Sequence, residues 1–497
     1  MKITSVIISI CLCICCLYDS LASDAVISLP PLSPGEASVC ISKADRSLSF
    51  KRSKEVLSDT PLHKQIITIN PKIHFQPIDG FGAALTGSTC YNLMQMSTQD
   101  RSAFLKQTFS PNEGLGFSYV RISIGCSDFS LSEYTCCDTP GIENFSLQQE
   151  EQLYIIPVLK EILLIRPDLK IMGSPWTSPR WMKVNNLKEL KPFNSWTSGQ
   201  LNPKYYQDYA LYFVKWIQAF QNHGISIYSI TPQNEPLNRG NSASLFMGWE
   251  EQLQFIKTAL GPALRNAKLQ TKIYAFDHNY NYDNMSDQKG YPLKLYSDPQ
   301  ASSFLAGAAF HNYGGNRQEL NLIHNASPDK ELIFTETSIG RWNDGRNLAK
   351  RLIDDMREVA LGTINNHCCG VIVWNLMLDS ERGPNRPGGC QICYGAVDIE
   401  KSDYKTIRFN SHYYIIGHLS IFVEPGAFRI EHSAIDCSGI ILSSFLNPDD
   451  TLAVALLNEN DTEIPLSLTS KNKQYLNITL PPRSVTSCRW NPNLENL

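Results

Sequence analysis

Lys170-Ile-Met-Gly-Ser174 and Ile227-Tyr-Ser-Ile-Thr231 are short, mostly apolar runs on either side of a helical segment, which begins at Asn202-Pro203 and ends near Gly224. Asn followed by Pro is typical of an N-cap and a first helical turn. Short continuous apolar runs are typical of strands that are buried on both faces. The stretch therefore predicts a strand–helix–strand unit with two parallel strands in one sheet.

The same alternation of short strands and helices extends over much of the chain. Ser146 and Gln149 form a capping-box signature before the helical pattern Glu150–Ile165, and Asn347–Ile364 is another amphipathic run. Eight β-then-α units predict an α/β fold, a (β/α)8 TIM barrel over residues 76–412. The eight predicted strands are Ile78–Gly82, Phe117–Ile122, Lys170–Ser174, Ile227–Thr231, Lys272–Asp277, Ala306–His311, Leu332–Thr335 and Gly370–Trp374.

The C-terminal part, residues 413–497, has a different pattern. From about Ile415 the chain shows short β-rich runs that are separated by turn residues, a pattern typical of a small antiparallel β-sandwich. Strand-like stretches within Ser47–Ile69 predict that the N-terminal segment, residues 24–75, joins this sandwich. The predicted C-terminal strands are Gly439–Phe445, Thr451–Leu457, Pro465–Leu468 and Gln474–Leu480.

The first 23 residues are typical of a signal peptide. Lys2 precedes an apolar run over residues 3–17 that is too short to span a bilayer, and Ala22-Ser23 offers small residues for cleavage. We expect a secreted or cell-surface protein, with Cys15 or Cys16 as an alternative site for a lipid anchor. No other run approaches about 18 apolar residues, so we expect no transmembrane segment in the mature chain.

Charge and cysteine content narrow the possible partners and cofactors. The net charge of −4 gives no basic field for a nucleic acid, which we therefore do not expect as a partner. Four of the 15 cysteines lie in the signal segment, so the other eleven must leave at least one thiol without a partner in the chain. Cys390-Gln-Ile-Cys393 lacks the second pair of a zinc site and the context of a redox motif, which favours a structural loop pair, either a disulfide or two thiols.

Catalytic residues of TIM barrels lie at the carboxyl ends of the strands, where two glutamates stand out. Glu235 follows the fourth strand in Thr231-Pro-Gln-Asn-Glu-Pro236, and Glu336 ends the seventh in Leu332-Ile-Phe-Thr-Glu-Thr337. A single glutamate there is usually a solvated loop charge. These two are separated by about three units of roughly 31 residues, so they can face each other across the barrel mouth. Such a pair can cleave a glycosidic bond, one carboxyl protonating the leaving oxygen while the other attacks the anomeric carbon.

Several ordered motifs resemble glycoside hydrolase family 30 over roughly residues 75–490. This resemblance implies a TIM barrel fused to a β-sandwich built from both chain ends, a retaining mechanism, and no metal or organic cofactor. The motifs are Asp79-Gly-Phe-Gly82, Val120-Arg-Ile-Ser123, Ser127-Asp-Phe-Ser130, Ser174-Pro-Trp-Thr-Ser-Pro179, Thr231-Pro-Gln-Asn-Glu-Pro236, Phe334-Thr-Glu-Thr-Ser338, Val373-Trp-Asn-Leu376 and Gly383-Pro-Asn385.

The resemblance assigns a role to each matching position. Glu235 resembles the acid/base, so we expect a raised pKa, and Glu336 resembles the nucleophile, which must be ionised. Arg121 resembles the cation that keeps the nucleophile ionised, and Asn234 resembles the residue that hydrogen-bonds the sugar 2-hydroxyl. The remaining matches to sugar-binding residues are Asp128, Trp176 and Trp374, and those to neighbours of the catalytic pair are His311 and Tyr313.

Structural roles compete with these assignments. Trp176 and Trp374 could be core residues, because tryptophan is often largely buried. His311 could be a buried structural histidine and Asp128 a turn residue. Arg121 could form an ion pair with a carboxylate of a loop. We favour site roles for all five.

Two short segments raise separate questions about the site. Asp277-His278-Asn279 after the fifth strand could suggest a metal site, although lining the cleft or capping the next helix is favoured. Thr86-Gly-Ser88 departs from the Thr-Asp pattern of many relatives and lacks their carboxylate, which leaves the role of that loop open.

Two loops bear on the substrate, which we expect to be a β-glucan or another β-glucoside. Arg382–Gly395 after the eighth strand and Asn238-Arg-Gly-Asn241 after Glu235 resemble the β-1,6-glucanase branch of the family. We therefore expect an endo-β-1,6-glucanase, with a glucosylceramidase as the alternative. A non-catalytic carbohydrate-binding protein is the alternative from another class, but it would be expected to lose a catalytic carboxylate. The sequence does not indicate an oligomeric state.

Overall fold

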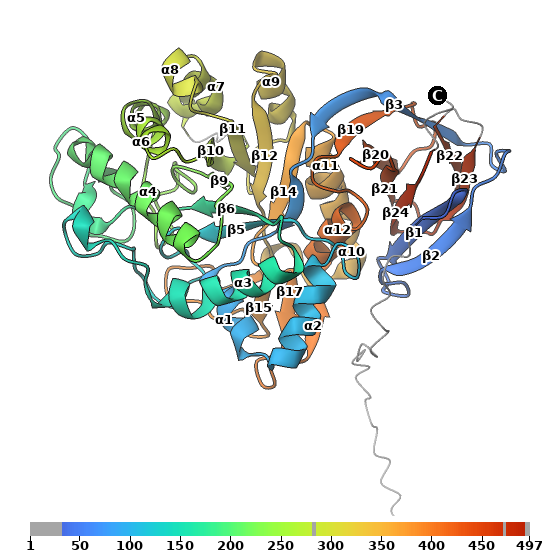
Figure 1. Ribbon diagram of the computed structural model, residues 1–497, viewed down its shortest axis with the longest axis horizontal. Coiled ribbons are helices and arrows are strands. Elements are labelled where there is room, and N and C mark those ends of the chain that lie inside the picture. The colour runs from blue at the N-terminus through green and yellow to red at the C-terminus, as the bar shows by residue number, and fades with distance from the viewer. Residues whose placement is uncertain (1–31, 281–284, 471–473, 493–497) are drawn as a thin grey trace, which may run out of the picture.

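A computed structural model describes residues 32–280, 285–470 and 474–492, which form a barrel and a layered β domain beside it (Figure 1). The predicted signal peptide, with Cys15 and Cys16, lies outside these residues. Within the described ranges, no helix has the length and apolar character needed to cross a membrane.

Eight parallel strands form the barrel sheet, in the order β4-β14-β12-β11-β10-β9-β6-β5. A parallel bridge between Ala84 and Arg121 connects the first and last strands of this order and closes the barrel. A strand occurs at each of the eight predicted runs. The strands are β4 (Gly80–Ala83), β5 (Tyr119–Ser123), β6 (Lys170–Ser174), β9 (Ser229–Ile230), β10 (Lys272–Asn279), β11 (Gly307–His311), β12 (Glu331–Glu336) and β14 (Cys368–Val373).

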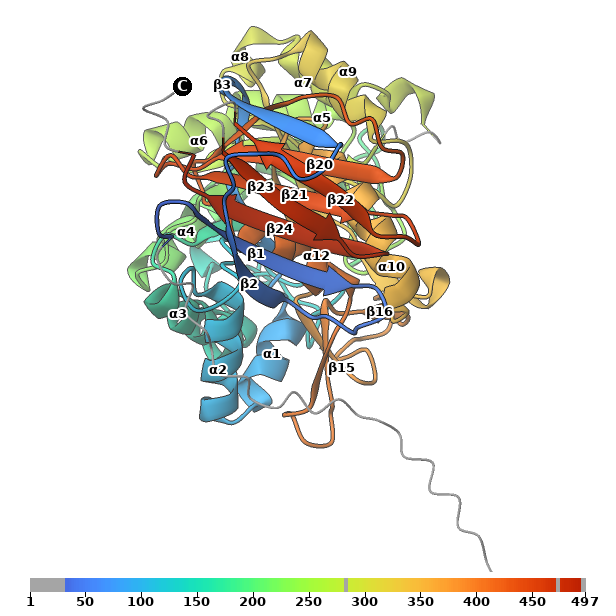
Figure 2. The same cartoon turned by 90° about the vertical axis from the view of Figure 1, so that its right-hand side faces the viewer.

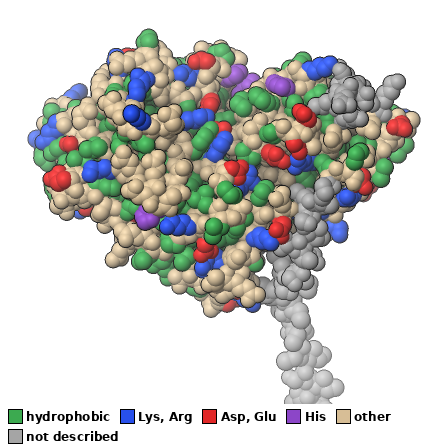
Figure 3. All heavy atoms as spheres, in the orientation of Figure 1, with side chains coloured by type: hydrophobic (Ala, Val, Ile, Leu, Met, Phe, Trp, Pro, Cys, Tyr) green, Lys and Arg blue, Asp and Glu red, His purple; other side chains and the backbone are tan. Residues whose placement is uncertain are grey.

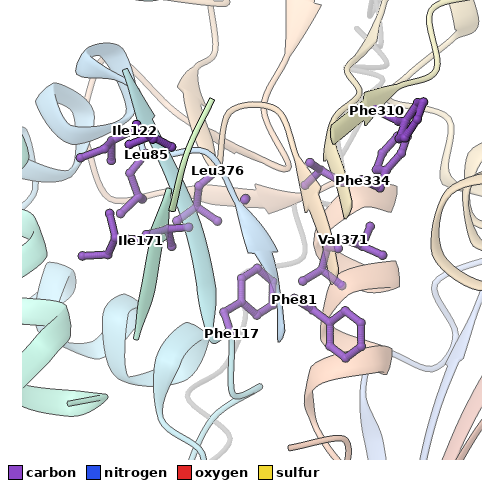
Figure 4. Close-up of a cluster of buried hydrophobic side chains, with 14 of the residues drawn as sticks. Phe81, Leu85, Phe117, Ile122, Ile171, Phe310, Phe334, Val371 and Leu376 are labelled. Carbon is purple, nitrogen blue, oxygen red and sulfur yellow. The ribbon is translucent and has the colours of Figure 1, made fainter. Parts of the chain in front are cut away.

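Side chains alternate along these strands between two buried layers, because successive residues of a strand point to opposite faces. In β12, for example, Leu332 and Phe334 belong to the large core that extends to the helices, whereas Ile333 belongs to a separate cluster with residues of other barrel strands. Figure 4 shows part of the large core, including Phe81, Phe334 and Val371. The barrel is therefore packed on both faces of its sheet, as its continuously apolar strands predict.

Helices cover the outside of the barrel (Figure 1). The predicted helix 150–165 forms as a π-helical turn (Glu151–Ile155) followed by α3 (Ile156–Ile165). The predicted helix after Asn202-Pro203 is α4 (Tyr206–Asn222), with Asn202 capping its 3-10 first turn. The other helices are α1 (Gly87–Gln95), α2 (Thr98–Phe109), α5 (Trp249–Phe255), α6 (Gly261–Asn266), α7 (Tyr291–Tyr296), α8 (Pro299–Ser302), α9 (Gln318–Ala326), α10 (Leu348–Asp355), α11 (Leu361–Ile364) and α12 (Ser411–Ser420).

Both chain ends build the second domain, a nine-stranded sheet beside the barrel (Figure 1), which lies in front of the barrel in Figure 2. The strand order is β2-β1-β24-β21-β20-β19-β3-β22-β23. The strands are β1 (Glu36–Lys43), β2 (Lys51–Val56), β3 (Ile66–Pro77), β19 (Phe428–His432), β20 (Ile440–Leu446), β21 (Leu452–Asn458), β22 (Ile464–Thr469), β23 (Tyr475–Leu480) and β24 (Ser484–Trp490).

Strand β3 connects the two parts of this sheet. Its first residues pair with β22 and its later residues pair with β19, where the register shifts. The pairing with β22 is parallel, whereas the other strand pairs of this sheet are antiparallel, as the sequence predicts for the sandwich. A separate apolar cluster, which includes Ile67, Leu456 and Trp490, fills this domain.

Residues 411–420 differ from the β pattern that we expected from about Ile415. They form α12, which contacts both barrel strand β4 and sandwich strand β24, and the sandwich strands resume only at Phe428. The helix is buried along its whole length, so its sequence lacks the polar face that marks an amphipathic helix.

Basic and acidic side chains are interspersed over the face of the molecule shown in Figure 3.

Candidate active site

A cavity of about 450 Å³ lies at the carboxyl ends of the barrel strands. Its lining includes five of the residues selected from the sequence, namely Asp128, Glu235, Tyr313, Glu336 and Trp374. The other four are buried: Arg121, Trp176 and His311 contact lining residues from behind, and Asn234 accepts a hydrogen bond from Arg121. The fold thus brings all nine predicted residues together.

Glu336 is the last residue of β12 and is 5% exposed. Arg121 donates to its Oε2 atom over 2.6 Å, and the Tyr313 hydroxyl donates to its Oε1 atom over 3.0 Å. Burial raises the pKa of Glu336 above its ordinary value, while the charges of His311 and Arg121 act in the opposite direction. Arg121 therefore offsets part of the desolvation that would otherwise keep this carboxyl protonated.

Arg121 lies in β5 and is fully buried. Besides Glu336, its guanidinium donates to Asn234 Oδ1 over 2.7 Å, to Asp277 Oδ2 over 2.8 Å and to Ser174 Oγ over 3.2 Å. Such a buried cation is stable only when its donors are paired, because an unpaired charge in the interior is very costly. Arg121 thus links four strands and strand ends around the barrel mouth.

Trp176 and Trp374 form an aromatic layer beside this cation. Their rings stack at a centroid distance of 5.1 Å and an interplanar angle of 24°. The Arg121 guanidinium carbon lies 4.9 Å from the Trp176 ring centroid and 5.5 Å from that of Trp374, within cation–π range. Since Trp374 also lines the cavity, the pair fixes one wall and excludes water from the side of Arg121.

Glu235 lies in the loop after β9 with a left-handed backbone, φ 44°. Its N–H donates to the carbonyl of Asp277, and its carbonyl accepts from the N–H of Asn238, both over 2.9 Å. A non-glycine residue in this conformation costs about 1–3 kcal/mol and persists only when its surroundings hold it. The carboxylate Oε2 accepts from Asn238 Nδ2 over 2.7 Å, so the loop also fixes the direction of the side chain.

His311 at the end of β11 connects Glu235 with Asp277. Its Nδ1 lies 3.3 Å from Glu235 Oε1 and its Nε2 lies 3.0 Å from Asp277 Oδ1. Burial opposes protonation of the ring, but the charge of Glu336 and the bonds to Asp277 and Glu235 raise the pKa of His311 to about 9. Thr231 and Thr335 also donate to the Asp277 carboxylate, each over 2.7 Å.

The charge on His311 determines the protonation of Glu235 in the absence of substrate. Burial acts to raise the pKa of Glu235, but the hydrogen bond from His311 and the charges of His278 and His311 lower it to about 2. The expectation of a raised pKa for Glu235 is therefore wrong for the free protein. The proton shared by Glu235 and His311 therefore lies on His311. His311 is in hydrogen-bond contact with the Glu235 carboxylate, which needs this proton to act as an acid.

Asp128 lies near the same two carboxylates, and the charge of Arg386 only partly offsets their effect on its pKa. Burial, followed by the charges of Glu336 and Glu235, raises the pKa of Asp128 to about 7. Its buried Oδ1 accepts no hydrogen bond within the described part of the protein. A polar atom left this way in a cavity wall is a natural partner for a ligand hydroxyl.

Arg386 positions the loop that carries Asp128. Its NH2 group donates to the carbonyls of Ser127 and Ser242, both over 2.7 Å, and its NH1 group pairs with Glu133 at 3.0 Å. The loops after β5, β9 and β14 are thereby tied together on one side of the cavity.

The loop after β14 also contains the Cys390–Cys393 disulfide, which confirms the predicted structural pair. The other nine cysteines of the described residues are unpaired, and eight of them are buried. Both bonded cysteines line the cavity. Strand β16 (Cys393–Tyr394) pairs with β13 (Ile339–Gly340), which joins this loop to the segment after Glu336.

One group of side chains in the site could hold a metal ion. Glu235, His278 and His311 each offer a ligand atom within 4.8 Å of the others. Glu235 and His311 already contact each other, so an ion there would have to replace that contact.

Two family models match the chain, one for each domain. The glycosyl hydrolase family 30 TIM-barrel domain matches residues 78–423, and the glycosyl hydrolase family 30 β-sandwich domain matches residues 426–488. The chain belongs to glycosyl hydrolase family 30. It is a β-glycosidase, as the matches to characterised members of family 30 also show.

Three proteins illustrate these similarities. Lysosomal acid glucosylceramidase of Mus musculus is 30% identical, covering 86% of this chain and 83% of the mouse protein. Endo-1,6-β-D-glucanase neg1 of Aspergillus fumigatus is 31% identical, covering 83% of this chain and 85% of the fungal protein. A solved structure of an endo-β1,6-glucanase is 61% identical with a TM-score of 0.90, covering 92% of this chain and 99% of that structure.

The loop Thr86-Gly-Ser88 of this family 30 chain packs against the side chain of Glu150. A Cβ atom on Gly87 would lie 1.8 Å from Glu150 Oε1, so the Glu150 carboxyl occupies the place of a side chain at residue 87. Glu150 is buried, which raises its pKa to about 7, and it accepts from the N–H of Leu131 over 2.8 Å. A carboxyl group is thus present beside this loop, but it comes from a different part of the chain.

Several residues of this family 30 site were not selected from the sequence. Asp277 was considered for a metal site, for lining the cleft or for capping a helix, but it accepts from Arg121 and His311 at the centre of the network. Its position at the end of the fifth predicted strand was the available signal. His278 and Asn279 line the cavity, as the sequence favoured, whereas Ser338 and Trp342 line it without having been assigned a role from the sequence.

Proposed function

We propose that this protein is an endo-β-1,6-glucanase that hydrolyses β-1,6-glucan with retention of anomeric configuration. The observation that carries the proposal is the 61% identity, over almost the full length of both chains, to an endo-β1,6-glucanase of known structure. The site supports it with two buried carboxyl groups in one cavity, each with its own hydrogen-bond partners.

In the first step, Glu336 is the nucleophile. A bond forms between its carboxylate and the anomeric carbon of the sugar while the glycosidic bond breaks. Arg121 and Tyr313 hold the carboxylate in place, and the positive charge of Arg121 favours its ionised form. Because these donors already contact the carboxylate, they need little reorganisation during the reaction.

Glu235 serves as the acid in this step and as the base in the next. It transfers to the leaving oxygen the proton that the Glu235–His311 pair holds, so that the leaving sugar departs as a neutral alcohol. In the second step Glu235 takes a proton from water, which attacks the anomeric carbon and releases Glu336. The two displacements together retain the configuration.

Two further residues would bind the reacting sugar. The oxygen of the Asn234 side chain accepts from Arg121, which directs its amide N–H group to the sugar 2-hydroxyl in this proposal. Asp128 would bind another hydroxyl through its unpartnered Oδ1 atom.

The test is hydrolysis of linear β-1,6-glucan by the purified protein without lipid or detergent. The expected products are short β-1,6-linked oligosaccharides, whose newly formed reducing ends are initially β by NMR. Release of glucose alone would contradict endo action, and α products would contradict retention. Linear β-1,3-glucan is the matched control polymer.

Glucosylceramide hydrolysis is the second candidate, supported by the 30% identity to mouse lysosomal acid glucosylceramidase. Glucosylceramide in mixed micelles should therefore be assayed beside the glucan. Cleavage of the lipid without cleavage of the glucan would replace the first proposal with this one.

Export is a separate part of the proposal, supported by Lys2 and the short apolar run that follows it. N-terminal sequencing of the protein from its native host would test it. We expect cleavage after residue 23. A lipid on Cys15 or Cys16 would indicate the anchored alternative.

A further inference from the structure

Trp342 lies at the open rim of the cavity. It is 50% exposed, which makes it the most exposed of the eight tryptophans, and it lines the cavity together with Glu235 and Glu336. A large aromatic ring in water loses the stabilisation that burial would give it, and exposed apolar surface in a groove often marks a ligand site.

The chain holds this indole in place through Gly340. A Cβ atom at Gly340 would lie 1.9 Å from Cζ3 of the Trp342 ring, so the ring rests directly against the glycine backbone. Gly340 pairs with Cys393 between β13 and β16, and the disulfide to Cys390 closes the loop that contains β16. The segment that carries the Trp342 ring is therefore held by a strand pairing and, through β16, by a disulfide.

The position of Trp342 relative to the carboxyl groups indicates which part of a substrate it meets. Glu235, Glu336 and Trp374 are 7%, 5% and 2% exposed, so a sugar that touches both carboxyl groups lies inside the cavity. A polymer must then pass the rim with its next unit. The face of a pyranose ring is lined by C–H groups that pack on an aromatic face, whereas its hydroxyl groups point outward to water.

We propose that the indole of Trp342 is a stacking platform for the glucosyl unit next to the one held at Glu235 and Glu336. Trp342 thereby favours chains of β-linked glucose over single glucosides. This inference rests on the proposed glucanase function, which supplies the polymer.

The test compares two substrates in the wild type and in Trp342→Ala. One is a series of β-1,6-linked gluco-oligosaccharides of two to six units. The other is β-glucosyl fluoride, whose leaving group is too small to reach a second sugar site. For the oligosaccharides, kcat/KM should fall roughly tenfold to a hundredfold, mainly through KM, as expected when an aromatic ring no longer covers its ligand. Hydrolysis of glucosyl fluoride should remain within about twofold.

Three further variants make the result specific. Trp342→Phe keeps an aromatic face and should recover most of the oligosaccharide activity. Gly340→Ala keeps the indole but displaces it, and should resemble Trp342→Ala. Leu322→Ala removes an exposed side chain of α9, and should behave as the wild type.

The outcomes separate this inference from the proposed function. A wild type that cuts no β-1,6-linked substrate would refute the glucanase proposal itself. Unchanged oligosaccharide kinetics in Trp342→Ala would overturn the inference that Trp342 is a stacking platform. An equal loss on both substrates would also overturn it, because the ring would then support the catalytic pair and not a neighbouring sugar.

Discussion

Replacing Arg121 with methionine should move the acidic limb of the pH–rate profile upward. The substitution keeps much of the side-chain volume but removes the cation that donates to Glu336 over 2.6 Å. An opposite charge at such a distance lowers a carboxyl pKa by about 1–3. Without it, burial and the charge of Glu235 raise the pKa of Glu336 further. Because the ionised carboxylate is the attacking form, activity is then lost at a higher pH.

The magnitude follows from that pKa change. The acidic limb of kcat/KM should rise by about 1–3 pH units, so the rate well below the limb should fall roughly tenfold to a thousandfold. Asp277 also loses its buried partner, which should destabilise the fold by about 3–5 kcal/mol. The profile is therefore measured at a temperature where circular dichroism shows a folded variant.

Arg121→Lys is the matched control because it keeps a positive charge at this position. Its acidic limb should stay closer to that of the wild type, although a lysine cannot reproduce all four hydrogen bonds of the guanidinium. A folded Arg121→Met variant with an unchanged acidic limb and full activity would refute the reasoning.

Three other changes give separate tests. With an activated aryl glucoside and azide, Glu235→Ala should give the β-glycosyl azide and Glu336→Ala the α product; the same anomer from both variants would contradict the assigned roles. The Cys390→Ser/Cys393→Ser double variant should raise KM for glucan several-fold, because both residues line the cavity, whereas its melting temperature should change little, since the bonded loop is short; an unchanged KM would show that the bond does not shape the site. Leu456→Ala in the sandwich core should lower the free energy of unfolding by about 2–5 kcal/mol in a denaturant titration, and a change below about 1 kcal/mol would argue against tight packing there.

The barrel and its catalytic pair were predictable because their signals are local. Each barrel strand is a short apolar run, and Glu235 and Glu336 follow two of these runs directly. The helix at residues 411–420 could not be recognised this way. Its Tyr413-Tyr-Ile-Ile416 run is apolar all round, and a buried helix and a buried strand share that pattern.

Other features depend on contacts that no local pattern reports. The pKa of Glu235 depends on His311, which lies at the end of another strand. The central position of Asp277 likewise depends on its contact with His311. Strand β1 did have a local signal, since Ala37, Val39 and Ile41 alternate with other residues. It was missed because strand-like stretches were sought only from Ser47 onward, after the end of this strand.

The strands of the sandwich come before and after the barrel in the sequence, which sets an order for folding on the ribosome. Strands β1 to β3 are synthesised first, but the partners β24 of β1 and β19 and β22 of β3 follow the whole barrel. At roughly 5–20 residues per second, the early strands wait on the order of tens of seconds with unpaired edges. Strand β24 lies between β1 and β21, so a chain that stops shortly before residue 484 lacks an interior strand of the sheet. Premature termination near the very end should therefore leave a finished barrel with an exposed, aggregation-prone sheet edge.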